Sequence, residues 1–188
     1  MNENSKIPLR ARNIVLIGFM GVGKTTIGQL VAKKLYRDFI DVDQEIEKNH
    51  NMSIQTIFQQ YGEEYFRKVE KEFIIDVCTN SRLKIISLGG GAYLQEDVRN
   101  VCLSKCIVFF LDLSWDSWKD RMPLIVDSRP LLKNKTLEEI EELFFKRRDA
   151  YSHHNSRVLT NDLDSETVAD HIVESIKWSW EIYEPNDE

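Results

Sequence analysis

Residues 18–25 combine glycines, a lysine and a threonine at the spacing of a phosphate-binding loop. They read Gly-Phe-Met-Gly-Val-Gly-Lys-Thr, which matches the pattern G-x-x-x-x-G-K-[S/T]. An apolar run at 14–17 precedes the loop, and a helical pattern that includes Ile27 and Val31 follows it. A loop between a strand and a helix directs backbone N–H groups and the helix N-terminus at phosphate oxygens. Lys24 would reach the β- and γ-phosphates and Thr25 would ligate Mg²⁺, so the sequence predicts a nucleoside triphosphate site.

Two carboxylates, Asp41 and Asp43, stand at the end of the second predicted strand. Alternation along a strand places both on one side, and ligands of open α/β sheets bind at the carboxyl ends of strands. One carboxylate can hold Mg²⁺ through water beside Thr25, while the other accepts a hydrogen bond from a substrate hydroxyl and acts as a base. The alternative is that one of them only caps the helix that begins near Gln44.

Three consecutive glycines, Gly89, Gly90 and Gly91, directly follow the third predicted strand. Glycines at a strand end let a ligand approach backbone N–H groups closely. A plain flexible turn is the competing interpretation.

The arginines are less informative on their own, because an isolated helical arginine usually faces solvent. For Arg67, the acid three residues on, Glu70, can form an intrahelical ion pair.

The elements that must position these residues alternate between strands and helices. We predict strands at 13–17, 38–42, 84–88, 106–112 and, more weakly, 156–160. Their continuous apolar runs are typical of parallel strands that are covered on both faces. Ser53 can cap one helix, Thr136 with Glu139 forms a capping box for another, and Ser165 can start the last. The predicted fold is an α/β three-layer sandwich with right-handed crossovers.

The 188 residues are predicted to form a single domain at 13–177. We expect residues 1–12 to be flexible, and the Trp-rich tail at 178–188 to pack on the domain, with self-association as the alternative. Segment 122–135 contains two prolines and three basic residues in an otherwise unpatterned connection. It is interpreted as a mobile lid, or else as a long surface loop.

Composition argues against several functions. A net charge of −6 and a pI near 5.3 disfavour a nucleic-acid partner. No apolar run reaches the roughly 18 residues of a membrane span, and the N-terminus lacks a signal-peptide pattern. Three cysteines (78, 102 and 106) and the pair His153-His154 do not have metal-ligand spacing, and the cysteines suit small buried positions in a reducing compartment. We expect a cytoplasmic monomer.

The chain resembles the shikimate kinases over about residues 12–175. The segments that carry the resemblance are, in chain order, 17–28, 39–43, 53–58, 62–70, 89–91, 129–132 and Arg147 with Tyr151. Many unrelated NTPases share the phosphate loop alone, but the ordered set is specific. The resemblance implies a P-loop NTPase fold of the nucleoside-monophosphate-kinase type, with a five-stranded parallel sheet, a substrate-binding segment at about 43–80 and a lid. It also implies transfer of the ATP γ-phosphoryl group to the 3-hydroxyl of shikimate, a step toward chorismate and the aromatic amino acids.

The same resemblance assigns roles to individual residues. The ATP-binding residues would be Gly21, Val22, Gly23, Lys24, Thr25, Thr26, Arg121 and Arg129. The shikimate-binding residues would be Asp43, Arg67, Gly89, Gly90, Gly91 and Arg147. Asp43 would orient or deprotonate the attacking hydroxyl, while Lys24 and Arg129 would neutralise charge on the transferring group. Thr25 would ligate Mg²⁺ directly and Asp41 through water, and Arg121 would pack on adenine.

Two competing functions stay open on sequence grounds. Another small-metabolite kinase of the same fold, such as a gluconate kinase, would share the phosphate loop but leave the arginine and glycine set unexplained. A non-catalytic ATP-binding regulator would keep the pocket without turnover. The intact set of Lys24, Thr25, Asp41, Asp43 and Arg129 argues against that second function.

Overall fold

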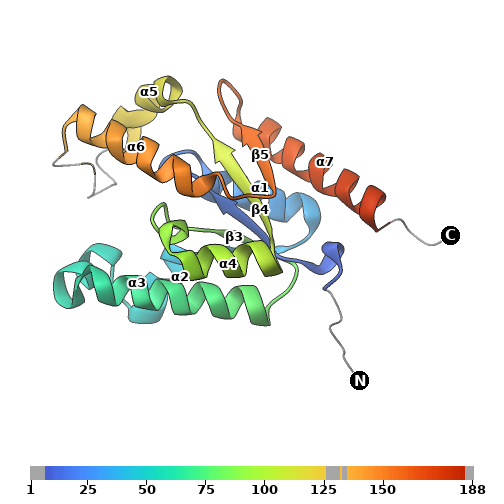
Figure 1. Ribbon diagram of the computed structural model, residues 1–188, viewed down its shortest axis with the longest axis horizontal. Coiled ribbons are helices and arrows are strands. Elements are labelled where there is room, and N and C mark those ends of the chain that lie inside the picture. The colour runs from blue at the N-terminus through green and yellow to red at the C-terminus, as the bar shows by residue number, and fades with distance from the viewer. Residues whose placement is uncertain (1–6, 126–131, 133–134, 185–188) are drawn as a thin grey trace.

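The computed structural model describes residues 7–125, 132 and 135–184. Five parallel strands form one sheet in the order β2-β3-β1-β4-β5, and helices cover both of its faces (Figure 1). The strands are β1 (Ile14–Ile17), β2 (Asp38–Asp41), β3 (Lys84–Ser87), β4 (Ile107–Asp112) and β5 (Ser156–Leu159). Every strand lies within one residue of its predicted range. The predicted α/β sandwich with a five-stranded parallel sheet is therefore confirmed.

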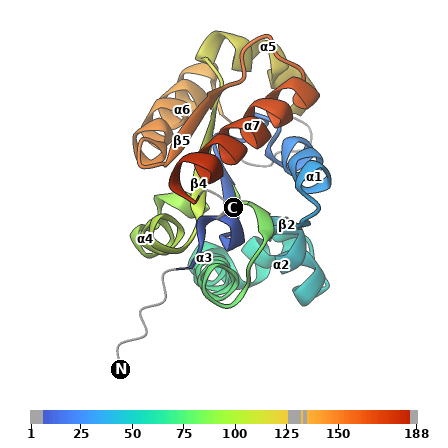
Figure 2. The ribbon, with the colours of Figure 1, turned by 90° about the vertical axis from the view of Figure 1, so that its right-hand side faces the viewer.

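The helices divide between the two faces of the sheet (Figure 2). They are α1 (Lys24–Leu35), α2 (Val42–His50), α3 (Ile54–Asn80), α4 (Glu96–Lys105), α5 (Trp115–Ile125), α6 (Leu137–Tyr151) and α7 (Ser165–Tyr183), with short 3-10 helices η1 (Leu9–Ala11) and η2 (Ala92–Leu94). Helices α1 and α7 pack together on one face, and α3 packs with α4 on the other. No helix among the described residues is long and apolar enough to cross a membrane.

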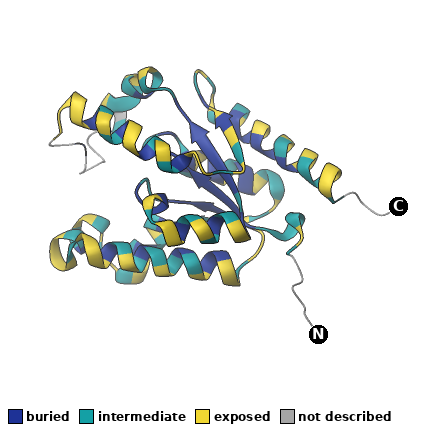
Figure 3. Cartoon of the chain, viewed as in Figure 1, coloured by how far each residue is buried: buried dark blue, intermediate teal, exposed yellow. Residues whose placement is uncertain are grey.

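The core is built around the central strands (Figure 3). Residues Ile14–Ile17 of β1 are at most 1% exposed, because strands on both sides and helices on both faces cover them. The continuous apolar run that predicted this strand thus reflects burial on two faces. All three cysteines are buried and none forms a disulfide.

Side-chain caps set the starts of several helices. Ser53 accepts a hydrogen bond from the Thr56 backbone N–H at the start of α3. Thr136 and Glu139 form the predicted capping box of α6. Ser165 is the first residue of α7, as expected, and the preceding Asp164 supplies the cap. These local signals are readable in sequence because capping depends on side chains within one turn.

Two predicted boundaries are wrong. Helix α2 begins at Val42, directly after β2, so Asp43 lies in the first turn of a helix and not on a strand. Residues 122–125 of the predicted lid belong to α5, whose last turn includes Pro123. Most of the remaining lid, including Arg129, lies outside the described residues.

The two ends of the described chain meet (Figure 1). The Glu184 carboxylate accepts hydrogen bonds from the backbone N–H groups of Leu9 and Arg10, at 3.1 Å for Arg10, and so holds η1 in place. Residues 9–11 thus form a short helix, while residues 1–6 of the segment expected to be flexible lie outside the described residues. Helix α7 continues past the predicted domain boundary at 177, and Trp180 packs on the core beneath the Arg37 guanidinium.

Candidate active site

The phosphate loop connects the end of β1 to the start of α1. Gly23 has a φ of 97° and caps α1, a backbone conformation that side chains other than glycine rarely adopt. The buried ammonium group of Lys24 donates hydrogen bonds to the carbonyls of Gly18 (2.8 Å) and Phe19 (3.0 Å). Lys24 therefore lies across the loop, in the position from which it can reach a phosphate group. Val22, within the loop, is also buried.

Asp41 contacts both the phosphate loop and the start of α2. Its Oδ2 accepts a 2.7 Å hydrogen bond from the Thr25 hydroxyl, and its Oδ1 accepts one from the Gln44 backbone N–H. The capping role and the position beside Thr25 thus belong to the same residue. Because Asp41 ends the strand in order to cap α2, the alternation argument does not apply to Asp43.

A cleft of about 280 Å³ joins the phosphate loop to the end of β3. Its lining includes Lys24, Thr25 and Thr26 of the phosphate loop and α1, the carboxylates Asp41 and Asp43, and the glycines Gly89 and Gly90. The two carboxylates do share one cavity, as the sequence predicted, although they belong to different kinds of element.

Each of the three consecutive glycines lies close to polar side chains from other parts of the chain. A Cβ atom at Gly89 would lie 2.7 Å from Asp43 Oδ1, and one at Gly91 would lie 2.7 Å from an Arg67 guanidinium nitrogen. At Gly90 the corresponding atom would lie 3.0 Å from an Arg147 nitrogen. None of these glycines has a positive φ. They are therefore required for space and not for backbone conformation, which favours the ligand-site interpretation over a flexible turn.

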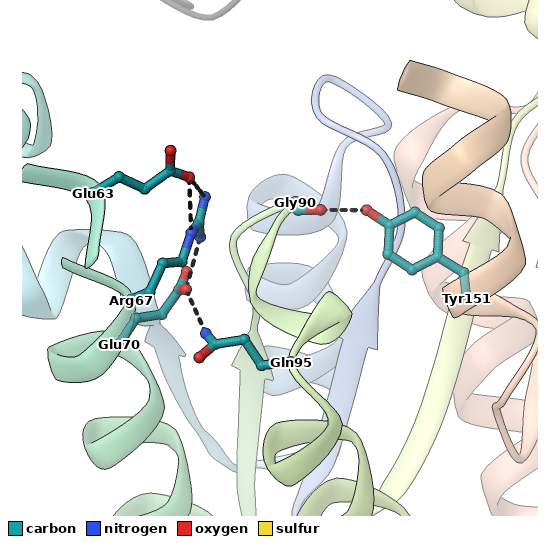
Figure 4. Close-up of polar contacts among 6 residues, drawn as sticks. All are labelled: Glu63, Arg67, Glu70, Gly90, Gln95 and Tyr151. Carbon is teal, nitrogen blue, oxygen red and sulfur yellow. Dashed lines mark hydrogen bonds and ion pairs between the residues drawn. The ribbon is translucent and has the colours of Figure 1, made fainter. Parts of the chain in front are cut away.

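Arg67 is held by two acids of its own helix (Figure 4). It forms a 2.7 Å ion pair with Glu70, as the spacing predicted, and a longer one of 3.3 Å with Glu63. Glu70 is fully buried, and its Oε2 also accepts a hydrogen bond from Gln95, whereas its Oε1 has no hydrogen-bond partner among the described residues. Burial raises the pKa of Glu70 to about 7 despite the opposing charge of Arg67.

Arg147 lies on α6 on the other side of the glycines. It is only 6% exposed, its guanidinium lies 5.6 Å from the centre of the Phe19 ring, and its Nε has no hydrogen-bond partner in the part of the chain that the structure describes. Burial lowers the pKa of Arg147, although an arginine remains charged at neutral pH. Among the residues described here, no carboxylate lies within ion-pair distance of it. A buried cation without a nearby acid is chemically suited to bind an anion, because burying an uncompensated charge is costly.

Tyr151 fixes α6 against the glycines. Its hydroxyl donates a 2.6 Å hydrogen bond to the Gly90 carbonyl (Figure 4). The sequence reasoning left this residue without a clear role. It lies one turn after Arg147 on the same buried side of α6, so it sets the distance between Arg147 and Gly90.

An aromatic cluster that sequence reasoning missed packs behind the phosphate loop. It consists of Phe19, Trp115, Trp118, Phe144 and Phe145. The Trp118 indole N–H donates a 2.8 Å hydrogen bond to the Met20 carbonyl across 98 positions of sequence. Such a long-range contact has no local signal in the sequence.

Arg121 lies one turn further along α5. One of its guanidinium nitrogens is 3.5 Å from the Thr160 carbonyl oxygen.

A family model described as "Shikimate kinase" matches residues 20–177. A shikimate kinase of Geobacillus thermodenitrificans is 71% identical over 99% of this chain and 100% of its own length. The chain belongs to the shikimate kinase family. A shikimate kinase of Bacillus subtilis is 60% identical over 98% of the chain and 100% of that relative.

Solved structures of shikimate kinases also match the fold. The Acinetobacter baumannii enzyme, solved in complex with shikimate, superposes with a TM-score of 0.80 at 30% identity, over 89% of this chain and 94% of that one. The Aquifex aeolicus enzyme gives a TM-score of 0.76 at 34% identity, over 89% of this chain and 97% of that one. The fold is thus the P-loop kinase fold that the sequence predicted.

Proposed function

We propose that this member of the shikimate kinase family transfers the γ-phosphoryl group of ATP to the 3-hydroxyl of shikimate, giving shikimate 3-phosphate and ADP. One observation favours a kinase with an anionic acceptor substrate over a P-loop kinase of unspecified substrate. The buried Arg147 has no acidic partner among the described residues and lies beside Gly90, while Arg67 lies beside the next residue, Gly91, and Gly90 itself lines the phosphate-loop cleft. This is a site for a small anion beside a nucleotide site.

Arg67 and Arg147 would bind the shikimate carboxylate. Guanidinium groups can donate two parallel hydrogen bonds to a carboxylate, which a lysine does not reproduce. Glu70 and Glu63 already orient Arg67, so that side chain loses little freedom when the substrate arrives. Gly90 and Gly91 leave the space between the two arginines open, because neither carries a Cβ.

Asp43 would accept a hydrogen bond from the attacking hydroxyl and orient or deprotonate it. It lines the cleft together with Lys24 and Gly89, between the phosphate loop and the glycines. A base in this position faces both the acceptor hydroxyl and the incoming phosphoryl group. Gly89 keeps a side chain from filling that corner, since a Cβ there would lie 2.7 Å from Asp43 Oδ1.

The described residues fit a nucleotide-bound Mg²⁺ and not a metal held by protein alone. No cluster of three or more His, Cys, Asp or Glu side chains suited to a metal occurs among them. Mg²⁺ in kinases takes one or two protein oxygens and completes its shell with water and phosphate, and the paired Thr25 hydroxyl and Asp41 carboxylate offer such oxygens. When bound, the ion would neutralise phosphate charge. Thr25 would ligate it directly and Asp41 through water.

Lys24 would bind the β- and γ-phosphates together with the backbone of residues 21–26. The remaining ATP-site assignments rest on the family resemblance. Arg121 would pack on adenine. Arg129, which lies outside the described residues, would meet the transferring group as the lid closes. A closed lid would keep water from the phosphoryl group and so limit ATP hydrolysis.

A coupled ADP-release assay tests this function directly. Purified protein with MgATP is given shikimate, gluconate or no acceptor, and we expect release that depends on shikimate. Release with gluconate alone would support a different small-metabolite kinase and would overturn the role of the two arginines. ATP binding without release for any acceptor would instead support a regulator without catalytic activity.

A further inference from the structure

Phe19 belongs to the phosphate loop but contacts the proposed shikimate site. Its backbone carbonyl accepts a 3.0 Å hydrogen bond from the Lys24 ammonium group. Its ring, in a residue that is 3% exposed, lies 5.6 Å from the Arg147 guanidinium carbon. The same residue therefore touches the cation that binds phosphate and the cation that would bind the substrate carboxylate.

The ring of Phe19 is held on its other sides by aromatic residues of α5 and α6. Its centroid lies 5.2 Å from that of Trp118 and 5.0 Å from that of Phe144, both in edge-to-face arrangements. Trp118 is also bound to the next loop residue through the Met20 carbonyl. Packed aromatic side chains of this kind move together, since the interior leaves no space for one ring to shift alone.

Nucleotide phosphates compete for the hydrogen bond that Phe19 makes. In this structure the Lys24 ammonium group donates to the Gly18 and Phe19 carbonyls. Phosphate oxygens are stronger acceptors for a charged donor, so a bound nucleotide would draw Lys24 away from these carbonyls. The backbone at Phe19 would then adopt the conformation of the nucleotide-bound loop, and the position of the Phe19 ring would change with it.

We propose that Phe19 is a positioning residue for Arg147 that couples the nucleotide site to the shikimate site. This inference rests on the proposed carboxylate-binding role of Arg147. An occupied phosphate loop fixes the Phe19 ring, and the ring face fixes the guanidinium through a cation–π contact. A site that is already ordered binds its second ligand at a smaller entropic cost, so each ligand tightens the binding of the other. We expect MgADP to lower the shikimate Kd by about 5- to 10-fold, at the lower end of the usual range of such coupling.

Isothermal titration of shikimate with and without MgADP measures the coupling. Phe19→Leu removes the ring face and keeps an apolar side chain, so the ratio of the two Kd values should fall to within about twofold of one. The matched control is Phe145→Leu, the same substitution in the same aromatic cluster. Phe145 packs on Phe144 and Trp115 and is 46% exposed, and it has no cation–π contact with Arg147 among the described residues. It should keep the wild-type ratio.

Tryptophan fluorescence gives a second readout. Trp115 and Trp118 are stacked with centroids 5.3 Å apart, and Trp118 contacts Phe19. MgADP alone should change their emission in the wild type and in Phe145→Leu but not in Phe19→Leu. If thermal melting shows that Phe19→Leu is unfolded, Phe19→Met, which also lacks a ring, takes its place and should give the same result.

The outcomes separate this inference from the proposed function. A wild-type Kd ratio of one, or a Phe19→Leu protein that keeps the coupling, would overturn the role of Phe19 and leave the kinase activity untouched. Shikimate binding that is unchanged in Arg147→Ala would instead remove Arg147 from the substrate site, and with it the basis of both proposals.

Discussion

Arg67 and Glu70 lie three residues apart on α3 and form a 2.7 Å ion pair in which the acid is far more deeply buried than the base. The side chain of Glu70 is 1% exposed, whereas that of Arg67 is 24% exposed. Desolvation therefore acts mainly on the carboxylate and outweighs the attraction of the arginine, which raises the pKa of Glu70 to about 7. Arg67 itself keeps about a quarter of its side chain exposed, as its proposed role in binding a substrate anion requires.

This raised pKa predicts that stability depends on pH. The folded state binds the Glu70 proton more tightly than the unfolded state does, whose pKa is near 4.5. The stabilising contribution is complete below pH 4.5 and is lost as pH rises through about 7, because fewer protons are then bound. Between these limits we expect the free energy of unfolding to fall by on the order of 1–3 kcal/mol relative to Glu70→Gln.

Urea denaturation of both proteins at several pH values between 5 and 8 measures this difference. Glu63→Gln is the control, because Glu63 also pairs with Arg67 but its side chain is 67% exposed. Parallel stability curves for the wild type and Glu70→Gln would contradict the assignment. A difference that appears equally in Glu63→Gln would show that Arg67, and not burial of Glu70, is its source.

The two arginines should affect shikimate and not ATP. Replacing Arg67 or Arg147 by alanine would remove one proposed partner of the substrate carboxylate, at a cost of about 2–5 kcal/mol in a desolvated site. We expect the shikimate KM to rise strongly, while the Kd for ATP, measured by titration in the absence of shikimate, changes little. An unchanged shikimate KM in either variant would exclude that arginine from the carboxylate site.

Asp43→Asn should separate binding from chemistry. Asparagine has nearly the same size as aspartate, so it fits the same space beside Gly89. It lacks the negative charge with which Asp43 would orient the attacking hydroxyl or accept its proton. We expect kcat to fall by about 100-fold or more with ATP affinity retained, in line with the usual contribution of a general base. Steady-state kinetics with saturating shikimate provides the measurement. Turnover at the wild-type rate would exclude Asp43 from the mechanism.

Gly91→Ala should impair shikimate binding without unfolding the protein. The added Cβ would lie 2.7 Å from an Arg67 guanidinium nitrogen, the far end of a long side chain that can move away. Because Gly91 has a φ of −103°, alanine meets no backbone strain there. We expect a higher shikimate KM with a Tm near that of the wild type. Gly23→Ala is the contrasting variant, since its φ of 97° should make the same substitution destabilising.

The sheet and the phosphate loop could be predicted from sequence because their signals are local. Burial on two faces produces apolar runs such as 14–17, and Gly23 and Lys24 stand beside one another in the chain. The position of Asp43 was predicted for the wrong reason. Strand periodicity extended β2 by one residue, whereas Asp41, one of the two carboxylates considered as a helix cap, caps α2 and ends the strand before Val42.

The contacts that complete the site could not be read from sequence. Trp118 binds the Met20 carbonyl, and Phe19 lies against Arg147, through contacts between residues about a hundred positions apart or more. No periodicity or motif encodes such a pair, since it exists only after the sheet brings α5 and α6 to the phosphate loop. The family resemblance selected Arg147, and the structure supplies a physical reason for that choice.

The bond between Glu184 and the start of η1 makes this chain a candidate for circular permutation. Residues 9 and 184 are already in contact, so a short peptide could join them without stretching the fold. New ends could open at Tyr36, which is 98% exposed in the turn between α1 and β2. Such a permuted chain should keep the same cleft, because neither the joined residues 9 and 184 nor the new ends at Tyr36 belong to its lining.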